Sequence, residues 1–166
     1  MSKPRFAIAA AACAALALLP SAASTQERNA ETRQHLTVWA DSFSAAFSPG
    51  WWEGEMQAFD SNGKMVDSTK SPSCIKSGES NRLATEMHDA MNSIADVGDC
   101  TSRSGGAGSL DLEMRCTMGD RQVTFLSKGQ YSDGAVDWTV DFKFTGPDAP
   151  TAQSMKVTAR RTRTSC

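Results

Sequence analysis

The sequence predicts a mainly β domain with minor α content. We expect a curved antiparallel meander sheet or half-open barrel, with one helix packed on it and an extra N-terminal helix. Three observations predict this fold: apolar and polar residues alternate through most of residues 110–144, Gly-containing turns interrupt that alternation, and four cysteines follow the N-terminal segment. Alternation with a period of two is typical of antiparallel strands with one buried face.

Residues 1–24 are typical of a secretory signal peptide. Two basic residues precede an uncharged apolar run at residues 6–19, which Pro20 and several small residues follow. This pattern predicts export, with cleavage near Ala23 or Ser24. The run is about 14 residues long, shorter than the roughly 20 that span a bilayer, although an uncleaved anchor is the alternative. We expect no transmembrane segment after signal cleavage.

Residues 25–48 form a predicted amphipathic helix or linker. Apolar residues recur there at steps of three or four, at Leu36, Trp39, Phe43 and Phe47. This spacing places them on one helical face, and Pro49-Gly50 ends the helix. The helix is either docked on the domain or free to meet a partner or a membrane surface.

Residues 49–166 form the predicted disulfide-stapled β domain. Its first hairpin has strands at 51–59 and 65–74, joined by a turn with the strong hairpin signal Asn62-Gly63. A second helix follows at Ser80–Ala95 and carries a single apolar face, formed by Leu83, Met87, Met91 and Ile94. We expect this second helix to be the one that packs on the sheet.

Two turns set the register of the later strands. A two-residue loop at Asp133-Gly134 pairs Phe125 with Phe142 and Gly129 with Trp138. A two-residue loop at Gly119-Asp120 pairs Met114 with Phe125 and Cys116 with Val123. Both registers bring the apolar residues to one face, which a slip of one residue would scatter to both faces.

Four cysteines in an exported chain indicate two disulfides. Cys100 and Cys116 are equidistant from Gly108 in a Gly-rich turn, so a hairpin there places them opposite each other. Cys74 and Cys166 then form the second bridge, which is one of three possible pairings. A zinc site is the rival interpretation, but the cysteine spacings match no zinc-finger pattern.

Two arginines interrupt the alternation of the last strand. Arg161 and Arg163 continue the parity of Met155, Val157 and Ala159, so they point toward the buried face. A bulge at Arg160-Arg161 or a wet sheet rim explains this placement. The functional alternative is a cationic lining for an anionic ligand.

Composition and motifs argue against several function classes. The chain has 17 Lys and Arg against 19 Asp and Glu, which disfavours general nucleic-acid binding. Only two histidines occur, and neither a Gly-x-Ser-x-Gly nor a His-Glu-x-x-His motif is present. We therefore predict no catalytic residues, no metal and no cofactor, and expect the protein not to be an enzyme.

The opening of the β domain resembles a known bacterial family. Pro49-Gly50-Trp51-Trp52-Glu53, followed by the four ordered cysteines, is similar to the pattern of domain of unknown function 3617 over residues 49–166. The helix at 25–48 and the absence of a Gly shortly before Cys166 depart from that pattern. The resemblance implies a periplasmic or envelope protein of a Gram-negative bacterium, with no established activity and no catalytic residues to transfer.

Our function hypothesis is a periplasmic protein that binds a small apolar ligand or an envelope protein. The candidate ligand-binding residues are the inward-facing Trp138, Phe125, Phe142, Met114 and Tyr131, together with Arg161 and Arg163. The alternative is an inhibitor or interaction module for a secreted hydrolase, which would bind through loops near Asp133 or residues 147–150.

Overall fold

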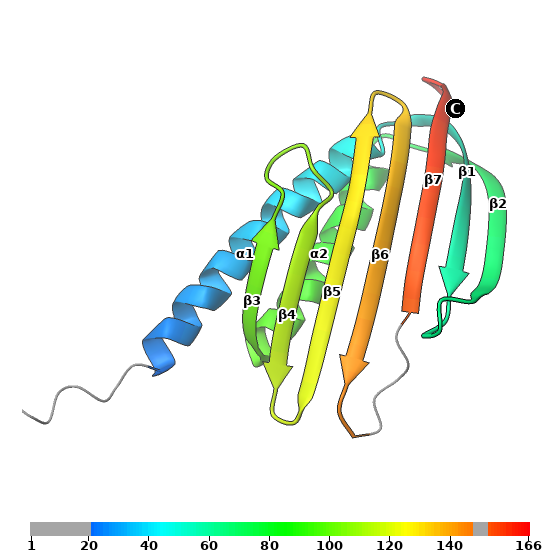
Figure 1. Cartoon of the computed structure of the whole chain (residues 1–166). Coiled ribbons are helices and arrows are strands. Elements are labelled where there is room, and N and C mark those ends of the chain that lie inside the picture. Colours follow the sequence, from blue (N-terminus) through cyan, green and yellow to red (C-terminus); the bar gives the residue numbers. More distant parts are fainter. Residues whose placement is uncertain (1–20, 148–152) are drawn as a thin grey trace, which may run out of the picture.

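The structure, a computed structural model, describes residues 21–147 and 153–166, with side chains from residue 25 onward. That part of the chain forms two helices and seven strands (Figure 1). The helices are α1 (Ser21–Ala46) and α2 (Glu79–Val97). The strands are β1 (Gly50–Phe59), β2 (Met65–Ile75), β3 (Asp99–Ser104), β4 (Leu112–Met118), β5 (Arg121–Ser132), β6 (Ala135–Thr145) and β7 (Gln153–Arg163).

The strands form one antiparallel sheet in the order β2-β1-β7-β6-β5-β4-β3. β7 therefore joins the first hairpin, β1–β2, to the strands that follow α2. The sheet is open, with β2 and β3 as its two edges. This arrangement confirms the predicted mainly β fold with two helices.

The predicted register of the later strands is confirmed. Phe125 pairs with Phe142 and Gly129 with Trp138 between β5 and β6. Met114 pairs with Phe125, and Cys116 with Val123, between β4 and β5. The two turns therefore align the apolar residues of three strands on one face, as the period of the strand requires.

Both predicted cysteine pairs are disulfides. Cys100 and Cys116 are directly paired residues of β3 and β4, with Cα atoms 4.1 Å apart. Cys74 at the end of β2 is bonded to Cys166, 92 residues later in the sequence. One bridge therefore lies at each edge of the sheet.

Both helices lie on one face of the sheet, and α1 makes the closer contact with it, whereas we expected the helix at residues 80–95 to be the one packed on the sheet. The Trp39 ring of α1 lies 5.6 Å from that of Phe125 and 6.4 Å from that of Trp138, between ring centroids. α2 packs mainly against α1. The reason is the size of the apolar stripes, because α1 presents large aromatic rings whereas three of the four buried residues of α2 are Ser80, Ala84 and Ala95.

One buried hydroxyl, that of Ser127, fixes α1 to the sheet. The indole N–H groups of Trp39 and Trp138 donate to Ser127 Oγ over 3.0 and 2.8 Å. The hydroxyl donates in turn to the carbonyl of Leu110, which also accepts from Trp39. A hydroxyl has one proton and two lone pairs, so this completely buried group uses its whole hydrogen-bonding capacity.

Asn29 of α1 fixes the other helix. Its Nδ2 group donates to the carbonyl oxygens of Ala95 and Gly98 over 3.0 Å each. Its Oδ1 atom accepts the backbone N–H of Cys100 at 3.1 Å. Asn29 therefore satisfies two carbonyls that the end of α2 leaves open, and it connects α2 to the start of β3.

We expect Ser127→Ala to lower the free energy of unfolding by about 1–3 kcal/mol, because Trp138 then keeps a buried N–H without its acceptor. Urea denaturation of the purified protein measures this change. Ser132→Ala, on the exposed end of the same strand, is the matched control and should change stability by less than about 0.5 kcal/mol. Equal effects of the two substitutions would contradict the role assigned to Ser127.

Candidate functional site

The two helices leave part of one sheet face open. Both lie on the same side of the sheet, behind β3, β4 and β5, and no helix of the described chain lies behind β1, β2 and β7 (Figure 1). The C-terminal end of α1 reaches the upper part of this face, where Phe47 packs on Trp52 with ring centroids 5.7 Å apart. The lower parts of β6, β7 and β1 remain beyond the reach of α1.

The open part of the face carries apolar side chains. β6, β7 and β1 pair so that alternate residues of each strand share the helix-facing side, as in the pairs Val140–Met155 and Val157–Met56. We call this set the open strip, and it consists of Val140, Phe142, Phe144, Met155, Val157 and Met56. Five of them are half-buried, whereas Met56 is 44% exposed.

The open strip is continuous with the hydrophobic core. The ring of Phe142 lies 5.8 Å from that of buried Phe125 and 4.8 Å from that of Phe144, between centroids. Val140, Met155 and Val157 also pack against the core. The strip is therefore the part of the core face that no helix of the described chain covers.

Three of the predicted ligand-binding residues lie in the core instead. Trp138, Phe125 and Met114 are 4%, 3% and 0% exposed. Trp39 and Phe43 of α1 pack against Trp138, so the helix takes the place that we expected for a ligand. This result corrects the prediction for these three residues.

The other two aromatic candidates are half-buried. Phe142 belongs to the open strip, whereas Tyr131 lies at the opposite end of β5, near the Gly-rich turn at Gly108. The sequence prediction thus included one residue of the strip and missed the rest. Two features of the sequence could have identified them. The alternation of β6 and β7 shows which of their residues share the apolar face, and two helices are too narrow to cover that face on all the strands.

Arg161 forms hydrogen bonds and an ion pair within the protein, so it is not available as a free cation for a ligand. Its guanidinium pairs with Asp133 in the β5–β6 turn and donates to Ser48 Oγ at 2.8 Å and to the carbonyl of Pro49. It thereby connects the end of β7 to the α1–β1 junction. The strand alternation breaks at Thr162, because Trp51 pairs with Arg163 and Trp52 with Arg161.

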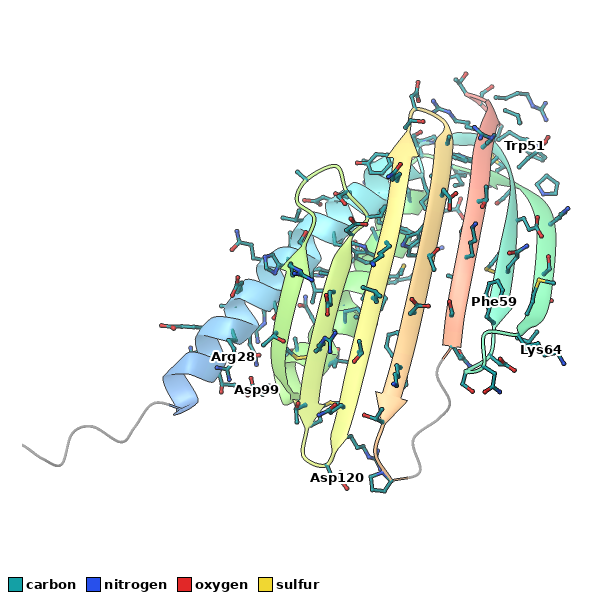
Figure 2. All side chains as sticks on the ribbon, viewed as in Figure 1. Arg28, Trp51, Phe59, Lys64, Asp99 and Asp120 are labelled. Atoms are coloured by element: carbon teal, nitrogen blue, oxygen red, sulfur yellow. A yellow bond between two sulfur atoms is a disulfide. The ribbon has the colours of Figure 1, made fainter. Side chains whose placement is uncertain are left out.

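Arg163 lies on the other side of this irregularity. Its guanidinium carbon is 5.1 Å from the ring centroid of Trp51, a cation–π contact at the exposed rim of the sheet. Figure 2 shows Trp51 at the upper end of β1, away from Phe59 at its lower end. The two arginines therefore do not form a shared cationic lining.

On the outer face of the sheet, charged side chains of neighbouring strands interact with one another. Hydrogen bonds from Arg115, and then from Arg103, hold the pKa of Glu113 below its usual value. Hydrogen bonds from Gln57 and Ser68 lower the pKa of Glu55 in the same way. This face is polar and solvated, in contrast to the uncharged open strip.

A surface groove of about 520 Å³ lies between the two helices. Its polar lining includes Asp41 and His88, and the side chains of Ser44 and Asn81 are hydrogen-bonded across it. Its apolar part consists of alanines, namely Ala40, Ala45 and Ala84. Alanines offer an apolar ligand much less contact area than the aromatic and thioether side chains of the strip.

Each histidine contacts a hydroxyl group, and His88 also contacts a carboxylate, since its Nδ1 atom lies 3.2 Å from Asp89 Oδ1. His35 Nδ1 lies 2.8 Å from Ser102 Oγ, and His88 Nε2 lies 3.3 Å from Thr37 Oγ1. Among the described residues, no group of three His, Cys, Asp or Glu side chains is placed to hold a metal ion. Neither helix in the described ranges is long and apolar enough to span a membrane.

The remaining predictions concern loops and the leader. Asp133 is engaged by Arg161, and residues 148–150 of the second predicted binding loop lie outside the described residues. Residues 1–20 of the predicted leader also lie outside them. α1 begins at Ser21, a few residues before the predicted start of the mature chain.

Comparison with known proteins identifies one family. A family model described as "Protein of unknown function (DUF3617)" matches residues 47–166. No curated protein and no solved structure matches the chain.

We expect Arg161→Ala to lower the free energy of unfolding by about 1–2 kcal/mol, because Asp133 and Ser48 lose a shared half-buried donor. Arg163→Ala removes only an exposed cation–π contact, and we expect a loss of no more than about 0.5–1 kcal/mol. Urea denaturation of both variants tests this difference. If inorganic phosphate stabilises the wild type and not Arg161→Ala, Arg161 belongs to an anion site and its assignment to contacts within the protein is wrong.

Proposed function

Because the chain belongs to the DUF3617 family of proteins of unknown function, we propose its function from its own surface. The proposed role is that of an exported, periplasmic or envelope protein that binds a small apolar ligand on the open strip. It is a binding protein and not an enzyme. The observation that carries this proposal is the uncovered apolar face between α2 and β2.

The disulfides and the leader support export. Cys74–Cys166 and Cys100–Cys116 suit an oxidising compartment, since such bridges rarely persist in the cytosol. Residues 1–24 have the charge, apolar run and small residues of a signal peptide. These observations favour the periplasm of a Gram-negative bacterium.

The composition of the open strip supports an apolar ligand. Contiguous exposed apolar patches are uncommon on monomeric soluble proteins and often mark binding sites. The strip combines two aromatic rings with Met56 and Met155, whose flexible thioether side chains adapt to ligands of different shape. Its position on strands of a disulfide-bonded sheet gives these side chains a rigid support.

A protein partner is the second candidate, and the edge strand β2 favours it. Every residue of β2 from Met65 to Ser73 is exposed, so a partner strand could pair with this edge. Pro72 lacks a backbone N–H and Lys70 places a charge on the edge, and both features oppose strand addition. We therefore rank the apolar ligand first.

We expect the mature protein to bind Nile red, a neutral apolar dye, with an increase in its fluorescence. Phe142→Ser should weaken this binding about tenfold or more, because a buried phenylalanine contributes about 1.5–3 kcal/mol. Met56→Asp should also abolish most of the binding, and its exposed position allows the change with little effect on folding. Fluorescence titration of the three proteins measures these affinities.

The matched control is Leu126→Ser, which removes a half-buried apolar side chain from the opposite face of the sheet. We expect this variant to bind Nile red as the wild type does. Wild-type protein that does not bind the dye, or equal losses in Leu126→Ser and Met56→Asp, would refute the strip as the ligand site.

We expect the full-length chain, expressed in a Gram-negative host, to yield a periplasmic protein whose first residue is Ser24 or Thr25. N-terminal sequencing identifies that residue, and peptide mapping without reductant tests for the two disulfides. Leu18→Asp, which places a charge in the apolar run, should keep the protein in the cytosol with reduced cysteines. Recovery of uncleaved wild-type protein from the cytosol would contradict export.

A further inference from the structure

β2 borders the open strip with a row of hydroxyl groups. Its helix-facing side chains pair with β1 as Thr69 with Met56, Ser71 with Gly54 and Ser73 with Trp52. We call Thr69, Ser71 and Ser73 the hydroxyl row. All three residues are exposed, and no helix of the described chain lies over them. The row therefore lies directly beside the apolar side chains of β1, on the same face.

This part of the face is uncharged. Among the described residues, the nine side chains of the open strip and the hydroxyl row include no acid or base. On β1, β2, β6 and β7, the charged residues with the helix-facing parity are Asp67, paired with Ala58 at the lower end, and Arg161, paired with Trp52 at the upper end. Arg161 is already engaged by Asp133.

The other charges of β1 and β2 lie on the outer face. Glu53, Glu55 and Lys70 alternate with the residues of the strip and the row, and they point to the outer side. A ligand with an ionic head group would therefore find no counter-ion above the hydroxyl row. A head group that carries hydroxyls could both donate to and accept from Thr69, Ser71 and Ser73.

We propose that the ligand is a neutral amphiphile whose hydrocarbon chain lies on the open strip and whose hydroxyl-bearing head lies on the hydroxyl row. This inference rests on the proposed function of the strip and specifies the chemistry of its ligand. The open strip runs from β6 to β1, a distance of two strand spacings or about 10 Å, and an extended chain of about ten carbons is long enough to cross it. Alkyl glycosides and monoacylglycerols belong to this chemical class.

The test compares three amphiphiles with the same ten-carbon alkyl chain, below their micelle concentrations, as competitors of Nile red on the mature protein. They are decyl glucoside (neutral), decyltrimethylammonium (cationic) and decyl sulfate (anionic). We expect decyl glucoside to displace the dye at about a tenfold lower concentration than either charged probe.

A triple variant, Thr69→Val with Ser71→Ala and Ser73→Ala, removes the hydroxyls of the row. We expect it to bind decyl glucoside about tenfold more weakly while its affinity for Nile red stays unchanged. Ser68→Ala removes a hydroxyl from the outer side of the same strand and is the matched control, with unchanged binding of both. Because all three row residues are exposed, the triple variant should fold as the wild type does.

The outcomes separate this inference from the proposed function. Equal displacement by all three probes, or an unchanged decyl glucoside affinity in the triple variant, overturns the neutral head group and leaves the strip as the binding site. Absence of Nile red binding overturns both proposals. A dimer in sedimentation analysis that Met56→Asp dissociates shows that a second copy occupies the strip, and it also overturns both.

Discussion

The hydrogen bonds of Ser127 determine how the two layers of this protein meet. Two tryptophans, one from α1 and one from β6, donate to a single hydroxyl that no solvent reaches. Such a group is costly to bury without partners, and it is fully satisfied only when Trp39 lies directly above β5. The apolar stripe of α1 supplies the energy of docking, and Ser127 defines the position at which the helix docks.

The position of α1 in turn determines which part of the sheet stays open. Six strand spacings of about 4.8 Å make the sheet about 29 Å wide, whereas two helices of about 10–12 Å side by side cover at most about 20–24 Å. α2 packs mainly against α1, so the two helices together cover less of the sheet than this width. An uncovered margin is therefore a geometric result of the fold, and in this protein the margin keeps apolar residues such as Phe142 and Val157.

The sequence predicted the strands and their register correctly, but it did not predict which element covers each part of the sheet face. The turns at Gly119-Asp120 and Asp133-Gly134 were sufficient for the register, and the symmetric spacing around Gly108 was sufficient for Cys100–Cys116. Periodicity identifies which face of a strand is buried, but it does not identify the element that buries it. For this reason Trp138 was assigned to a ligand, although α1 covers it. The contacts of Arg161 could not be predicted either, because its partners Asp133 and Ser48 lie 28 and more than 100 residues away in the sequence.

The central position of β7 has a consequence for how the protein acquires its fold. Among the seven described strands, this one is synthesised last, yet it lies between the β1–β2 hairpin and β6 in the sheet. The pairing of β1 with β7 joins distant parts of the chain, which raises the contact order and slows folding. Until β7 is available for pairing, β1 and β6 both present unpaired edges, so the newly synthesised chain passes through an interval in which it is prone to aggregation.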